Sequence, residues 1–253
     1  MDVLVSHLPL VVILCVGIFV QSAAGFAAGL LIVPSLLWFD YTIPEAQCAL
    51  LVATIPQNLW GVWSLRDSIT ARQVAAPGIT RVMFFPLGVM TLQLLESLNV
   101  ATLRQIVGGF VLLVTLAIML FRPRPRESLS PIWAMIAFPL SGFFQGLVGM
   151  GGPAMVFWVQ AHDWGSRRMR AFMFAMYLIS IGPALAVLYM FFGQRIIWPG
   201  LVTAILTPLL LLVTVFGLRF GTRLGRHRLR RVSVALLLLI GAAGLAAPLI
   251  TPG

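Results

Sequence analysis

The sequence predicts an all-α polytopic membrane protein made of two inverted repeats, each a broken helix or hairpin followed by three transmembrane helices. Three observations predict this fold. The 253 residues are 60% hydrophobic and 9% charged, whereas a soluble domain has roughly 45–50% apolar and 25% charged residues. The charged residues divide the chain into apolar runs of membrane-spanning length. Two longer runs contain glycine-rich interruptions at corresponding places in the two halves.

The composition excludes several classes of protein. So much apolar surface cannot be covered by the few polar side chains of a soluble enzyme, a disordered chain or a nucleic-acid-binding protein. The net charge of +10 has another origin, because all 17 basic residues are arginines and most lie in short clusters between apolar runs. This distribution is typical of loops that orient a membrane protein. Cys15 and Cys48 lie in apolar stretches and are predicted to be packing residues.

A helix needs about 20 apolar residues to cross the hydrocarbon core. Six runs have that length: 46–65, 73–95, 105–121, 171–194, 196–218 and 232–253. The run 73–95 reaches this length only if Arg81 is tolerated within it. Residues 3–39 as one helix would be roughly 55 Å long, nearly twice the core thickness, and residues 128–162 pose the same problem. Small residues and glycines interrupt them at 21–25 and 145–153. Each long run is therefore predicted to be two helical segments joined at a break.

The two long runs begin two halves of the chain, residues 1–126 and 127–253. If each long run is a hairpin, the loops on one side hold fourteen arginines and those on the other hold two. If each crosses once, the division is ten to six. The positive-inside rule favours fourteen to two. Each half then has an odd number of segments, so the halves are inverted, both termini lie outside the cytoplasm and the arginine-rich loops lie inside.

Inverted repeats with broken helices at matching positions are typical of secondary transporters. A helix start directs unpaired N–H donors and a partial positive charge at one point, which suits an anion. Close helix packing is the alternative role for glycines spaced like Gly142 and Gly146. An anion channel could use the same breaks as a selectivity filter. A membrane-embedded enzyme is disfavoured, because the sequence shows no nucleophile–base pair or metal cluster.

Polar residues within the spans are candidates for the substrate pathway. Gln57 lies beside Thr54 and Asn58, which are one helical turn apart and share a face. Arg81 has two interpretations: its side chain reaches the headgroups, or it is the counter-charge for an anion. The predicted substrate-binding residues are Gln21, Ser22, Gly25, Thr54, Gln57, Asn58, Arg81, Gln145, Gly149, Met150, Gly151, Gly152 and Ser180.

The seven acidic residues all lie at predicted loops or span ends. No carboxylate is therefore placed within a span to relay protons or hold a bare cation, which argues against a cation pump. No nucleotide-binding loop of the Gly-x-x-x-x-Gly-Lys type occurs, so ATP is not expected to drive transport directly. No cofactor and no metal are expected.

The second break, Ser141-Gly142-x-x-x-Gly146-x-x-Gly149-Met150-Gly151-Gly152, resembles the glycine-rich repeat of the TauE/SafE family of sulfite and organosulfonate exporters. The chain length, the two-half layout and the arginine-rich loop before the last span are also similar to that family. The resemblance implies export or exchange of a small sulfur-containing or carboxylate anion across a bacterial inner membrane. The expected partners are that anion and membrane lipids, with no nucleic acid; a homo-oligomer is left open.

Overall fold

The computed structural model describes residues 8–24, 28–120, 126–127, 129–224 and 226–247. Within these residues the structure is helical, apart from one isolated bridge between Arg126 and His162. The α-helices are α2 (Leu8–Ala24), α3 (Ala28–Leu36), α4 (Ile43–Ser64), α5 (Ala71–Leu95), α6 (Val100–Leu120), α7 (Pro131–Val148), α8 (Gly152–Gln160), α9 (Ser166–Phe192), α10 (Ile197–Ile205), α11 (Thr207–Leu224) and α12 (Arg226–Leu245). Three short 3-10 helices join them: η1 (Leu37–Phe39), η2 (Arg66–Ser68) and η3 (Gly193–Ile196).

Four helical segments of the described chain are long and apolar enough to cross a membrane. They are Ala71–Leu95, Val100–Leu120, Pro131–Val148 and Ser166–Ile205. Shorter apolar helices include α2 and α3. α4 has 22 residues, and amide side chains near its middle lower its apolar character. These helices confirm the predicted all-α polytopic membrane protein.

The first long apolar run is divided between α2 and α3. α2 ends at Ala24 and α3 begins at Ala28. The predicted site residue Gly25 lies between them, outside the described residues. α3 has nine residues, so at 1.5 Å per residue it spans roughly half of the hydrocarbon core.

The second long run is divided between α7 and α8, as predicted. Gly149 ends α7 with a φ of 71°, a left-handed conformation that favours glycine because it lacks a Cβ. Its N–H donates to the carbonyl of Gln145 at 3.0 Å, and the N–H of Met150 donates to that of Phe144 at 3.2 Å. α8 then has nine residues, like α3. We call α3 and α8 the half-helices.

The run from 196 to 218, expected as one span, is two helices. α10 ends at Ile205 and α11 begins at Thr207. Pro208 is the physical reason, because it has no N–H to donate to the carbonyl of Ala204 and its ring crowds that carbonyl. The two pieces then pack differently: α10 contacts α4, whereas α11 lies along α2.

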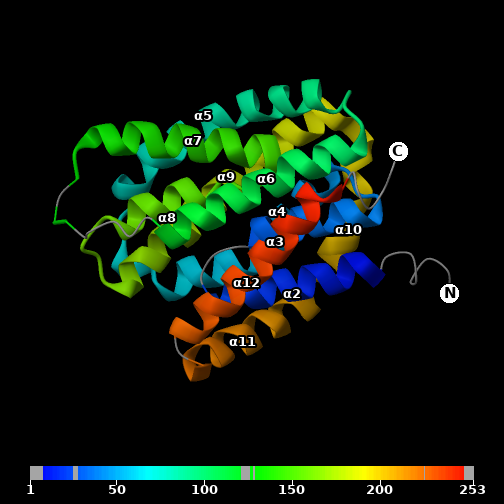
Figure 1. Cartoon of the computed structure of the whole chain (residues 1–253). Coiled ribbons are helices and arrows are strands. Elements are labelled where there is room, and N and C mark those ends of the chain that lie inside the picture. Colours follow the sequence, from blue (N-terminus) through cyan, green and yellow to red (C-terminus); the bar gives the residue numbers. More distant parts are fainter. Residues whose placement is uncertain (1–7, 25–27, 121–125, 128, 225, 248–253) are drawn as a thin grey trace.

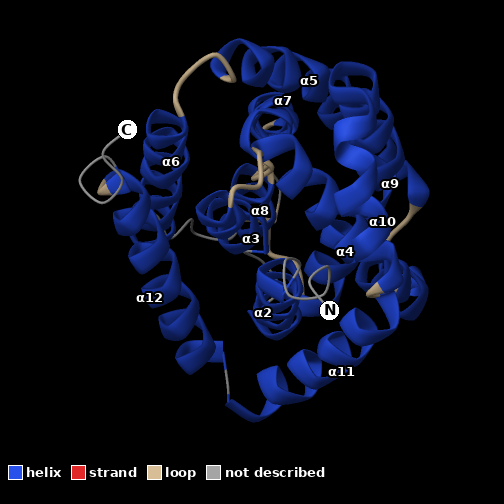
Figure 2. Ribbon diagram, turned by 90° about the vertical axis from the view of Figure 1, so that its right-hand side faces the viewer, coloured by secondary structure: helices blue, strands red, loops and turns tan. Residues whose placement is uncertain are grey.

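Four pairs of helices make the most extensive contacts: α5 with α7, α6 with α12, α2 with α11, and α4 with α9. α2 begins and α12 ends at the same end of the bundle (Figure 1). The half-helices lie in the interior, with α5, α6, α9, α11 and α12 around them (Figure 2). The bundle therefore encloses both half-helices and shields them from lipid.

Glycines bring α5 and α7 into backbone contact. A Cβ on Gly142 would clash with the carbonyl of Arg81, and a Cβ on Gly146 would clash with that of Phe85. On the facing helix, a Cβ on Gly88 would lie 2.7 Å from the backbone nitrogen of Leu147. The packing interpretation of Gly142 and Gly146 is thus confirmed, while the glycines from 149 onward form the break.

We expect Gly88→Ala to destabilise the protein by about 1–3 kcal/mol, because the added methyl group has no space between two backbones. Gly182→Ala is the matched control, since Gly182 is also helical and a Cβ there would have no neighbour within 4 Å. The control should be neutral or slightly stabilising, because alanine is the better helix former. Thermal unfolding of the detergent-solubilised variants measures the difference. Equal melting temperatures would show that the α5–α7 contact is not this close.

Candidate functional site

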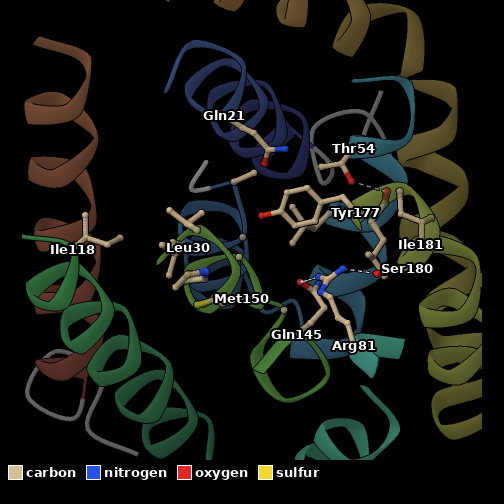
Figure 3. A pocket seen from close by; sticks show the side chains of 18 residues that line it. Gln21, Leu30, Thr54, Arg81, Ile118, Gln145, Met150, Tyr177, Ser180 and Ile181 are labelled. Carbon is tan, nitrogen blue, oxygen red and sulfur yellow. Dashed lines mark hydrogen bonds between the residues drawn. The ribbon is translucent and has the colours of Figure 1, made fainter. Parts of the chain in front are cut away.

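A cavity of about 50 Å³ lies at the starts of the two half-helices. Eight of the thirteen predicted site residues line it: Gln21, Thr54, Arg81, Gln145, Gly149, Met150, Gly152 and Ser180. They come from α2, α4, α5, α7, α8 and α9 and the turn before α8, so the fold joins segments far apart in the sequence (Figure 3). One water needs about 10–15 Å³ of such volume, so the cavity suits a compact solute.

Both half-helices begin at this cavity. Ala28 and Gly29 at the start of α3 and Gly152 and Pro153 at the start of α8 are among the lining residues. The first turn of α3 also meets the second break, because a Cβ on Gly29 would lie 2.6 Å from the carbonyl oxygen of Gly149. A helix start carries a partial positive charge and unpaired N–H groups. The cavity therefore receives two helix starts, an arrangement that favours an anion.

Arg81 of α5 is buried, with 2% of its surface exposed. Its Nε–H donates to Ser141 Oγ at 3.0 Å, and Nη1 donates to the carbonyl of Met176 at 3.2 Å and to Ser180 Oγ. Nη2 donates to Gln145 Oε1 at 3.3 Å. The side chain points into the bundle, so the interpretation that it reaches the headgroups is wrong. A guanidinium has five N–H groups, and these four bonds leave one of them without a partner among the described residues.

The partners of Arg81 connect it to the second break. Ser141 Oγ–H donates to the carbonyl of Gly151 at 2.6 Å, and the N–H of Gly151 donates to Gln145 Oε1 at 3.1 Å. The amide of Gln47 on α4 donates to the carbonyl of Gly146 at 3.1 Å, near the end of α7. Gly151 does not line the cavity, but its two backbone groups fix the break to the residues that hold Arg81.

All the acceptors around Arg81 are neutral, and no acidic residue lines the cavity. Acidic residues instead lie at helix ends. Arg195 pairs with Glu96 at 3.3 Å and with Glu45 at 4.0 Å. Burial raises the pKa of the Glu96 carboxyl, an effect that Arg195 opposes and Glu45 reinforces. Within the described residues, no three His, Cys, Asp or Glu side chains gather to hold a metal ion. The lining of the cavity thus has a net positive charge from Arg81.

A second, smaller cavity of about 10 Å³ shares Arg81, Gln145 and Ser180 with the first. Phe85 of α5 and Pro183 of α9 also line it. Phe85 lies on the C-terminal side of Arg81, and Pro183 lies on the C-terminal side of Ser180. This volume is about that of one water. The Arg81 network therefore borders both cavities.

Four other predicted residues have different surroundings. Ser22 donates to the carbonyl of Ile18 at 2.7 Å, and its Cβ lies close to Gly217 of α11. Gln57 and Asn58 are buried on α4 and do not line the cavity. Gln57 Oε1 and both polar atoms of the Asn58 amide have no hydrogen-bond partner in the described part of the chain. Gly151, the fourth, supports the break as described above.

Sequence reasoning missed Tyr177 of α9, which lines the cavity. Its ring centroid lies 5.4 Å from Arg81 Cζ, a cation–π contact. Its hydroxyl would lie 2.7 Å from a Cβ on Gly152, so it faces the start of α8. Its position three residues before Ser180 could have indicated a shared helix face, but a tyrosine in an apolar run is ordinarily read as packing or as an interfacial aromatic.

Comparison with known proteins gives one family and one curated relative. The profile of the family described as "Sulfite exporter TauE/SafE" matches residues 9–244. The "Probable sulfite/organosulfonate exporter TauE" of Cupriavidus necator is 24% identical over 245 residues, which cover 96% of this chain and 94% of that protein. No solved structure gives a significant match. Because the family profile covers nearly the whole chain, this multi-pass membrane protein belongs to the sulfite exporter TauE/SafE family of transporters.

Proposed function

We propose that the protein moves a small anion across the bacterial inner membrane by alternating access. The anion is sulfite, an organosulfonate or a similar sulfur-containing or carboxylate anion. The observation that carries the proposal is Arg81, a buried cation without a carboxylate partner in the described residues, beside a cavity where two half-helices begin. The name of the Cupriavidus necator relative supports the same substrate class.

The anion would bind against Arg81 and the two helix starts. Burial of an unbalanced charge is costly, and a substrate anion would neutralise it. Hydrogen bonds between a guanidinium and an oxyanion are charge-assisted and are roughly twice as strong as neutral ones. Because the Arg81 side chain is buried, this attraction is weakened less by solvent than it would be at the protein surface.

We further infer that the two halves, residues 1–126 and 127–253, are inverted repeats. Exchanging the halves pairs α2 with α7, α3 with α8, α4 with α9, and α6 with α12, while α5 corresponds to α10 and α11 counted as one segment. Under this exchange the α5–α7 contact becomes α11–α2, and the contacts α6–α12 and α4–α9 map onto themselves. If a two-fold axis relates the halves, each contact between helices must correspond either to another observed contact or to itself. Five segments in each half would start the second half from the opposite side of the membrane.

Alternating access would open first one end of the bundle and then the other around Arg81. The two cavities that share Arg81, Gln145 and Ser180 support alternating access, because the same group of side chains borders both cavities. Gln57 and Asn58 support it too, because an unpaired buried amide costs about 1–3 kcal/mol. We propose that these two side chains line the substrate path in another conformation.

The first test is sulfite counterflow in proteoliposomes, in which internal unlabelled sulfite accelerates uptake of labelled sulfite. Saturable counterflow is expected of a carrier, and flux without it would indicate a channel. Arg81→Gln should raise the half-saturating sulfite concentration on the order of 10- to 100-fold, because a charged hydrogen-bond donor is lost. Arg81→Lys should retain part of the affinity, since it keeps the charge but not the planar fork.

Arg167→Gln is the matched control for charge. Arg167 is exposed, bonds to Ser68 Oγ at 3.1 Å and does not line the cavity. Its substitution should leave counterflow at the wild-type level. Melting temperatures of all three variants establish that the protein is folded. Wild-type sulfite affinity in folded Arg81→Gln would contradict the anion site.

A second prediction concerns Asn58→Leu. Replacing an unpaired buried amide by an apolar side chain of similar size should leave the melting temperature unchanged or raise it. Sulfite counterflow should nevertheless fall at least about tenfold if the amide lines the path, a barrier change of about 1.4 kcal/mol. Thr115→Val is the control, because Thr115 is buried but bonds to the carbonyl of Val111 at 2.7 Å. A stabilised Asn58→Leu protein with full counterflow would assign Asn58 to packing alone.

The proposed orientation predicts which loops face outward. In a background with Cys15 and Cys48 replaced by alanine, Ser97→Cys should react with a membrane-impermeant maleimide in intact cells. Ser130→Cys should react only after the cells are opened, because the arginine-rich loops face the cytoplasm. Both serines are exposed. The reverse labelling pattern would place the termini in the cytoplasm.

A further inference from the structure

Neutral polar groups line the cavity across from Arg81. Figure 3 shows Gln21 of α2 on the far side of the space from Arg81, with Tyr177 between them. In the described chain, the Gln21 amide and the Tyr177 hydroxyl have no hydrogen-bond partner, although both residues line the cavity. The Thr54 hydroxyl donates to the carbonyl of Leu51 at 2.9 Å and keeps its acceptor capacity. These groups can satisfy an uncharged polar part of a solute.

Among the described residues, no acidic side chain lines this cavity. Six of the seven acidic residues fall within the described chain, and none of them lines it. The seventh, Asp2, lies outside the described residues, and residues 25–27 at the first break are Gly, Phe and Ala. Within the described part of the chain, the charged side chain that a solute meets here is the guanidinium of Arg81.

The geometry points to substrates that are compact anions whose remaining groups are uncharged, and to rejection of zwitterions with an ammonium group. This inference rests on the proposed anion site and specifies its substrate class. An ammonium group in the cavity would lose its water without gaining a carboxylate. It would also share a space of about 50 Å³ with Arg81, a like charge at short range. A hydroxyl group in the same position meets neither penalty and can bond to Gln21 or Tyr177.

Two sulfonates of nearly equal size test the inference. 2-Hydroxyethanesulfonate and 2-aminoethanesulfonate differ only in a hydroxyl against an ammonium group at neutral pH. Each competes, unlabelled, with labelled sulfite in counterflow into proteoliposomes that contain the whole protein. We expect half-inhibition by the hydroxyl compound at a concentration at least about tenfold lower, which corresponds to 1.4 kcal/mol.

The outcomes separate the inference from the proposed function. Equal inhibition by the two sulfonates, or stronger inhibition by the amine, would overturn the inferred rejection of zwitterions. The proposal that the protein carries anions would still stand. Absence of sulfite counterflow from folded protein would contradict the proposed function instead. In that event, ligand-induced rises in melting temperature compare the two sulfonates directly, because a ligand that binds only the folded protein stabilises it.

Gln21→Glu tests whether the charge of the lining sets this preference. The substitution keeps the shape of the side chain and adds a carboxylate across from Arg81. The preference for the hydroxyl compound should fall at least about tenfold, whether measured by competition or by thermal stabilisation. Gln93→Glu makes the same change at an exposed residue of α5 and should leave the preference unchanged. An unchanged preference in folded Gln21→Glu would overturn the inference.

Discussion

The buried guanidinium of Arg81 joins three of the helices that form the cavity, α5, α7 and α9. A charge in the interior of an apolar bundle must be hydrogen-bonded, because it has no water to solvate it. Two serine hydroxyls, a glutamine side chain and a backbone carbonyl supply that solvation. They are all neutral, so they hold the cation without cancelling it. α5, α7 and α9 must therefore keep their relative positions for the site to exist.

The close contact between α5 and α7 meets that requirement. Gly142 and Gly146 allow the backbones to touch next to Arg81 and Phe85, which brings Arg81 within reach of side chains on the same turns of α7. Those side chains also bond to the backbone of Gly151 in the second break. The glycines near this break thus have two separate roles, helix packing and formation of the turn into α8. One network joins the charge to the break.

The distribution of charge explains why this architecture suits an anion. The acidic residues of the described chain lie at helix ends or in loops, where Glu45, Glu96 and Asp40 pair with arginines. The cavity has a positive lining, neutral polar groups and two helix starts. Membership of the sulfite exporter TauE/SafE family agrees with this distribution. The same charge balance, applied to the whole solute, separates simple anions from zwitterions.

The membrane class, the two interrupted apolar runs and eight of the residues that line the cavity are predictable from the sequence alone, because apolar run length and intramembrane polar residues are local signals. The direction of the Arg81 side chain is visible only in the folded protein, because an arginine within a span can either extend to the headgroups or turn inward. The tertiary structure also decided that Tyr177 joins the site, that Ser22 faces α11 and that α10 and α11 are separate. These outcomes depend on contacts between helices far apart in the chain, which spacing along one helix does not encode.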